Sequence, residues 1–222
     1  MIERLPYVII FYPVLLFSLS LHEAAHAWVA NRKGDPTARL LGRITLNPVP
    51  HMDLMGTVIL PLAALLMGAP LFGWGKPVPV DGRYLRQPRR DFLWIAAAGP
   101  ISNICLAACF ALGGRALMAA VPHLAPIPFV RIPFWETAIG AGFAICQIGV
   151  LLNMALALFN LIPIFPLDGG SVLRGLLPAR SVPAYDRFAQ YGLLMLVILF
   201  VSGALRFLAI PISVASAWLL PL

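Results

Sequence analysis

Long apolar runs separated by short polar loops make up most of this chain. The runs cover residues 7–30, 56–73, 92–120, 137–162, 188–205 and 207–221. A helix rises about 1.5 Å per residue and the hydrocarbon core of a bilayer is about 30 Å thick, so a crossing helix needs roughly 17–25 apolar residues. The first, third, fourth and fifth runs meet that length. The pattern therefore predicts membrane-spanning helices over these four runs.

The run at 56–73 is not expected to cross the membrane as one continuous helix. Pro61, Gly68 and Pro70 interrupt it, and both residue types disfavour a continuous helix. Basic residues fill the loops on both sides: Arg32, Lys33, Arg39 and Arg43 before it, and Lys76, Arg83, Arg86, Arg89 and Arg90 after it. Basic loops tend to stay in the cytoplasm, and irregular backbone is tolerated where protein or a wet cavity surrounds it. We expect a re-entrant element at about 56–80 with both ends cytoplasmic.

The same rule orients the remaining runs. The first run then crosses from outside to inside, and twelve of the sixteen basic residues lie in the cytoplasm, including Arg174, Arg180 and Arg187. The last run, weakened by Pro211 and Pro221, either spans or lies half-buried. The expected fold is an all-α polytopic membrane protein with five to six membrane segments. It forms one integral-membrane domain over 1–222, with a core at about 7–175 and C-terminal segments at about 188–221.

Composition agrees with this class. The 222 residues are 60% hydrophobic and 11% charged, which is typical of polytopic membrane proteins and not of soluble domains. The net charge of +7 resides in short loops between apolar runs, so no nucleic-acid partner is expected. Cys105, Cys109 and Cys146 lie in apolar runs as small hydrophobic residues, and their odd number argues against a disulfide framework. The first run lacks a small-residue cleavage site, so we expect it to be retained.

A group of ionisable residues, His22-Glu23-Ala24-Ala25-His26, lies inside the first run. Histidines at positions i and i+4 share one helix face and are separated by roughly 6 Å along the axis, so both rings can reach one metal ion. Glu23 is placed to take a proton from water at that metal. Ionisable side chains cost roughly 3 kcal/mol or more near a bilayer centre, so they need a role. The pattern predicts a metal site; the alternative is a buried, hydrogen-bonded set without metal.

Catalytic zinc usually takes three protein ligands, so a third is needed. Of the nine carboxylates, Glu23 and Asp168 are the two in strongly apolar surroundings. Asp168 ends the segment Asn160-Leu-Ile-Pro-Ile-Phe-Pro-Leu-Asp168, at the inner end of the 137–162 run, and the expected topology brings it to the depth of His26. The alternative is a loop carboxylate that caps a helix starting near Ser171.

These motifs resemble the site-2 protease family of intramembrane zinc metalloproteases. HEAAH matches that family's HExxH helix, NLIPIFPLDGG matches its NxxPxxPLDG signature, and AAAGPISN, with Gly99 and Asn103, matches its middle core segment. The matches follow the family's order over about residues 15–175. The resemblance implies one Zn²⁺ per chain held by His22, His26 and Asp168, with Glu23 as general base and Asn160 as a contact to the substrate backbone or transition state. A minimal form without a PDZ or other regulatory domain is expected.

The resemblance implies hydrolysis of peptide bonds within or near transmembrane helices of single-span substrate proteins, in the lipid bilayer of a bacterial or archaeal cytoplasmic membrane. The active site is expected to face the cytoplasm. His51 is an alternative oxyanion donor to Asn160, and residues 74–80 are either an edge that pairs with an unwound substrate or a simple loop. A membrane metal transporter or a non-catalytic metal-dependent protein is the alternative function. The sequence leaves the substrate and the oligomeric state open.

Overall fold

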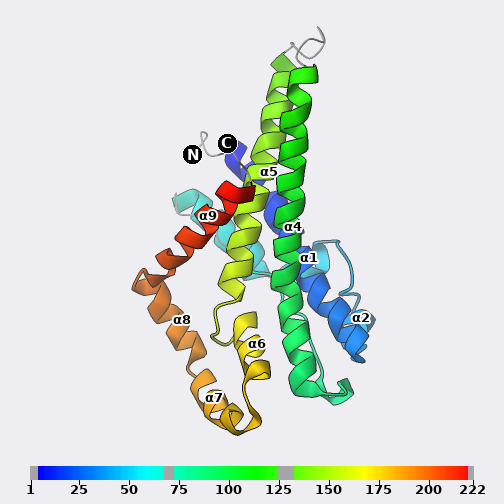
Figure 1. Cartoon of the computed structure of the whole chain (residues 1–222), viewed down its shortest axis with the longest axis vertical. Coiled ribbons are helices and arrows are strands. Elements are labelled where there is room, and N and C mark those ends of the chain that lie inside the picture. Colours follow the sequence, from blue (N-terminus) through cyan, green and yellow to red (C-terminus); the bar gives the residue numbers. More distant parts are fainter. Residues whose placement is uncertain (1–4, 68–72, 125–132, 220–222) are drawn as a thin grey trace.

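Every regular element in the described part of this protein is a helix. The computed structural model describes residues 5–67, 73–124 and 133–219, and no strand occurs within these ranges (Figure 1). The α-helices are α1 (Leu5–Lys33), α2 (Thr37–Leu40), α3 (Leu60–Met67), α4 (Pro88–Leu124), α5 (Pro133–Asn160), α6 (Asp168–Leu176), α7 (Val182–Ala189), α8 (Gly192–Val201) and α9 (Ala209–Leu219). The all-α class expected from the sequence is confirmed.

Three described helices are long and apolar enough to cross a membrane. They are Val8–Lys33, Pro88–Pro122 and Thr137–Asn160, which confirms long apolar helices over the first, third and fourth runs. The span predicted at 188–205 is divided, because the helices at Ala179–Ala189 and Gly192–Val201 meet at a 60° bend and qualify as a span only together. The described residues thus give three candidate spans, or four with the bent pair, and the count of five to six segments is not confirmed.

The start of α8 lies against the loop between α5 and α6. Gly192 lies so close to the carbonyl of Phe165 that a side chain there would overlap it. The last run forms α9, whose 11 residues extend about 16 Å and are too short to cross a bilayer. Residues 220–221 of that run lie outside the described ranges.

The element expected to be re-entrant begins as two short helical pieces. Leu54–Ile59 forms wide helical turns and leads directly into α3, and the Asp53 carboxylate accepts the amide hydrogen of Gly56 at the start. Residues 68–72 fall outside the described ranges, so the return path stays a prediction. The loops before and after the element meet, because the amide of Asp81 donates to Oδ2 of Asp35 at 2.7 Å.

Helices α1, α4 and α5 form the core that carries the site, and α6 packs on α4 (Figure 1). Phe11, Leu15 and Leu19 of α1 contact an apolar face of α5. Small residues line the closest helix contacts: Ala24, Ala27 and Ala30 on α1, and Ala107 and Ala111 on α4 are buried. Small side chains let helices approach closely inside a membrane. The same close approach brings the HEAAH turn of α1 against α4.

Candidate metal centre

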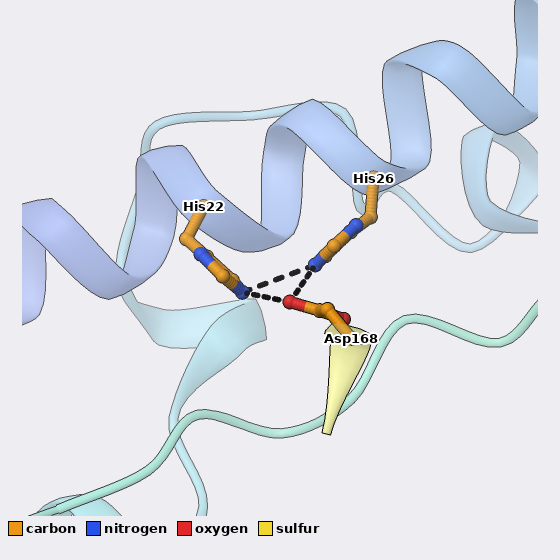
Figure 2. Close-up of side chains that lie close together, drawn as sticks. All are labelled: His22, His26 and Asp168. Carbon is orange, nitrogen blue, oxygen red and sulfur yellow. Dashed lines mark hydrogen bonds and ion pairs between the residues drawn. The ribbon is translucent and has the colours of Figure 1, made fainter. Parts of the chain in front are cut away.

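Three side chains from two helices converge on one point. Figure 2 shows His22 and His26 of α1 pointing toward Asp168 of α6. The two Nε2 atoms are 3.0 Å apart, and Oδ2 of Asp168 lies 3.2 Å from Nε2 of His22 and 3.4 Å from Nε2 of His26. Both rings are at least nine-tenths buried. The three residues expected from the sequence to bind one metal are therefore brought together.

Gly99 of α4 makes room for the two imidazoles. A methyl group at this position would overlap Nε2 of His26 and both Cε1 and Nε2 of His22. Ring atoms cannot move aside as the end of a flexible chain can, because other contacts hold both rings. Gly99 of the AAAGPISN motif is thus required because a side chain would clash with the two imidazoles, and not because of its backbone conformation.

Asp168 is positioned by the turn between α5 and α6. It is the first residue of α6, and the residue at the cap position, Leu167, provides no side-chain hydrogen bond. The Asp168 carboxylate faces the histidines and not the start of its own helix, so the capping alternative does not describe it. Gly169 and Gly170 pack against the carbonyls of Leu161 and Ile162 and against the backbone of Ile164 and Phe165, where added side chains would clash.

The main-chain carbonyl of Gly149 can only accept, and this determines the direction of each hydrogen bond in the chain that leads to His22. Asn153 donates its Nδ2 to the carbonyl of Gly149 at 2.8 Å and to Oγ of Ser18 at 2.9 Å, so its Oδ1 faces Asn103 as an acceptor. Nδ2 of Asn103 donates to that oxygen at 2.8 Å, which turns Oδ1 of Asn103 toward Nδ1 of His22 at 2.6 Å. An amide oxygen only accepts, so Nδ1 of His22 carries the proton.

His26 is held in the same tautomer. Its Nδ1 lies 2.7 Å from the carbonyl oxygen of Ile95 and donates to it. In its neutral form each ring presents a lone pair at Nε2, and the two Nε2 atoms are 3.0 Å apart. Oδ2 of Asp168 is buried without a hydrogen-bond partner, although it lies within 3.4 Å of both Nε2 atoms. Three electron-rich atoms that face one another form a site for a cation.

Zinc fits this donor set. Two imidazole nitrogens and one carboxylate oxygen are typical ligands of a catalytic zinc site, which keeps a fourth position open. At bond lengths of about 2.0–2.1 Å, tetrahedral ligands lie roughly 3.3 Å apart. The three separations here are 3.0, 3.2 and 3.4 Å. The side chains are thus already spaced to hold the ion.

Glu23 and Asn160 line the same cavity as the three candidate ligands. This cavity has a volume of about 490 Å³, and residues 73–75, Pro77, Val78 and Val80 form part of its wall. Oε2 of Glu23 accepts the amide hydrogen of Val78 at 3.1 Å. Nδ2 of Asn160 donates to the carbonyl of Leu156 at 2.9 Å, and its second hydrogen remains available. All five site residues expected from the sequence therefore meet around one cavity.

His51 is not arranged as an oxyanion donor. Its ring is 2% exposed, Nε2 donates to the carbonyl of Thr45 at 2.8 Å, and Nδ1 is buried without a hydrogen-bond partner. Burial lowers the pKa of His51, so the ring stays neutral and has no second N–H to offer. Its main-chain carbonyl instead accepts the amide of Lys76, which fixes the segment that forms the cavity wall.

Sequence reasoning assigned no role at the metal centre to Arg43, Ser18 or Asn153. Arg43 is 6% exposed and donates to the carbonyls of Lys76 and Pro77, so it holds the chain just before the amide that contacts Glu23. Asn153 and Ser18 are fully buried in helices α5 and α1. An amide in a long apolar run is a detectable signal, but the search that selected Asp168 considered carboxylates and so did not include Asn153.

Replacing Asn103 with leucine is expected to weaken zinc binding on the order of 10–100-fold, because the variant leaves Nδ1–H of His22 without its acceptor. Competition with a zinc-binding dye on monodisperse protein measures the affinity. Ser102→Ala is the matched control, since Ser102 neighbours Asn103 and its hydroxyl donates only to Gly99 within the same helix. Equal zinc affinity in wild type and Asn103→Leu would contradict this role for Asn103.

Comparison with known proteins identifies the family. The profile of Peptidase family M50 matches residues 125–203. The chain is 35% identical over 201 residues to "Putative zinc metalloprotease YwhC" of Bacillus subtilis (strain 168), covering 90% of this chain and 83% of that protein. It is 31% identical over 209 residues to Rip2 of Mycolicibacterium smegmatis, which carries the same description, with 92% and 73% covered.

No solved structure matches this chain, so the assignment rests on sequence. The identity to YwhC extends over most of both proteins, and the apolar helices agree with insertion into a membrane. This chain therefore belongs to peptidase family M50, the site-2 protease family of intramembrane zinc metalloproteases.

Proposed function

We propose that this protein hydrolyses peptide bonds within or next to transmembrane helices of single-span membrane proteins, with His22, His26 and Asp168 as the zinc ligands. The observation that carries the proposal is the convergence of three electron-rich ligand atoms in a cavity that Glu23 and Asn160 also line. The proposal treats residues 1–222 as one integral-membrane protease domain. No contact in the described residues favours the transporter alternative.

When bound, zinc supplies Lewis-acid activation of water and of the substrate carbonyl. Glu23 takes the proton from the attacking water and then delivers it to the leaving nitrogen. The Val78 amide, 3.1 Å from Oε2, keeps the Glu23 carboxylate turned into the cavity. The free N–H of the Asn160 amide donates to the substrate backbone or to the developing oxyanion.

Residues 74–80 meet the substrate in this proposal. A transmembrane helix bonds its own backbone groups and must unwind before cleavage. The amides of Trp74, Lys76 and Val78 already donate within the chain, and Pro77 and Pro79 have no N–H. An unwound substrate would therefore pair here mainly by donating its own amides to carbonyls of the segment.

The Asp168→Asn variant is expected to lose bound zinc and proteolytic activity together, because the amide is a weaker ligand than the carboxylate. The assay measures bound zinc and cleavage of one membrane-embedded substrate in the same preparation. Asp186→Asn is the control, since Asp186 is exposed and its ion pair with Arg174 lies away from the cavity. Full zinc occupancy in Asp168→Asn with normal cleavage would remove Asp168 from the ligand set.

We further propose that both ends of the 56–80 element lie in the cytoplasm, at a bacterial or archaeal cytoplasmic membrane. The support is the hydrogen bond between Asp35 and Asp81, which joins the two flanking loops. In a variant with its three cysteines replaced, Leu41→Cys and Tyr84→Cys are expected to react with an impermeant thiol reagent from the same side. Both positions are more than half exposed. Labelling from opposite sides would rule out the re-entrant path.

A further inference from the structure

A second cavity lies where the end of α1 meets the start of α4. It has a volume of about 470 Å³, and four basic side chains line it together with one carboxylate: Arg32, Lys33, Arg86, Arg90 and Asp91. The cavity shares no lining residue with the metal centre. The basic side chains that line this cavity are therefore separate from the zinc-binding residues.

The single carboxylate in this cavity is already engaged. Oδ1 of Asp91 pairs with Nζ of Lys33 at 3.3 Å, and Oδ2 accepts the amide of Gln87 at 2.9 Å. The guanidinium of Arg32 lies over the ring of Trp28, 4.9 Å from its centroid. Within the described residues, Arg86 and Arg90 form no ion pair. Three positive charges in a small space thus lack a counter-charge, and a bound anion would relieve their repulsion.

The cavity lies at the ends of two candidate membrane spans. The spans Val8–Lys33 and Pro88–Pro122 end and begin at its walls, and Trp28 and Trp94 are about half exposed beside it. Exposed tryptophans at helix ends mark the headgroup region of a bilayer. Ile101, two turns further along α4 and on the same side as Trp94, is 50% exposed. A basic site thus continues into an exposed apolar strip.

We propose that this cavity binds the phosphate headgroup of an anionic phospholipid. Guanidinium groups donate paired hydrogen bonds to phosphate oxygens, and Lys33 adds a point charge. Basic cavities between helix ends are suited to anionic headgroups. The apolar strip of Trp94 and Ile101 favours a lipid over free phosphate, because acyl chains would cover it while an inorganic ion would leave it exposed.

The test is native mass spectrometry of the zinc-loaded full chain in micelles, titrated with phosphatidylglycerol or phosphatidylcholine. Wild-type protein is expected to retain one phosphatidylglycerol more tightly than phosphatidylcholine. Arg86→Gln/Arg90→Gln is expected to lower the phosphatidylglycerol affinity on the order of 30-fold. Arg180→Gln/Arg187→Gln removes the same charge from exposed positions at and near α7 and is expected to leave the affinity unchanged.

Three results would overturn the proposal. The first is an equal loss in both double variants, which would mean diffuse attraction by net charge. The second is an unchanged affinity in Arg86→Gln/Arg90→Gln. The third is displacement of the lipid by inorganic phosphate at a comparable concentration, which would make free phosphate the ligand. Zinc content and circular dichroism of each variant establish that it is folded, and Arg86→Lys/Arg90→Lys, which keeps the charge, is expected to retain part of the affinity.

Discussion

Glu23→Gln is expected to lower cleavage of a single-span membrane substrate on the order of 10²–10⁴-fold while zinc content stays at one per chain. The amide has the shape of the carboxylate, and its oxygen can still accept the Val78 amide that now contacts Oε2. What it loses is the capacity to take a proton from water. The cavity and the ligands are therefore retained while the general base is removed.

Zinc content and cleavage of the same substrate should be measured on wild type, Glu23→Gln and Asp186→Asn. The Asp186 variant makes the same chemical change at an exposed carboxylate of α7 and is expected to cleave normally. Normal cleavage by Glu23→Gln would remove the proton-transfer role argued for this residue and would favour a non-catalytic use of the metal. Loss of zinc in Glu23→Gln would instead give Glu23 a structural role.

Gly99→Ala is expected to weaken zinc binding roughly 10- to 100-fold and to lower cleavage with it. The added methyl group would overlap atoms of both ligand rings. The rings cannot rotate away without breaking the hydrogen bonds from Nδ1 of His22 to Asn103 and from Nδ1 of His26 to Ile95. Either α4 moves or the two Nε2 atoms separate, and both outcomes disturb the site.

Gly113→Ala on the same helix is the matched control for Gly99→Ala. Its added methyl group would lie 3.6 Å from Sγ of Cys146, an ordinary contact distance. Both variants raise helix propensity by the same amount, so a difference between them reports the space at the metal centre. Equal zinc affinity in the two variants would mean that α4 does not constrain the histidines.

The parts predicted from the sequence are those with local signals. The helices α1, α4 and α5 follow from the length of their apolar runs, and HEAAH places two ligands on one helix face whatever the rest of the chain does. The division of the 188–205 run was not predicted, and Gly192 at this division contacts the backbone of Phe165. Apolar length alone contains no information about that contact.

The hydrogen-bond partners of His22 and Glu23 also could not be predicted from residue spacing. The partner that orients His22 is 81 residues away in the chain, and the next amide lies a further 50 residues on. Glu23 accepts a hydrogen bond from the main-chain amide of Val78, and every non-proline residue has such an amide. Composition and spacing cannot select such groups, since they become partners only after α1, α4 and the 74–80 segment have packed.

The amide chain from Gly149 through Asn153 and Asn103 to His22 joins α5, α4 and α1 in a fixed register. A slide of α5 along its axis by one residue, about 1.5 Å, would break the chain and free the His22 ring. Thermodynamic linkage makes this relation reciprocal, because a metal that prefers the oriented ring must also favour the aligned helices. The metal would then stabilise the packing of α1, α4 and α5 in addition to its chemical role, and its removal is expected to loosen this packing.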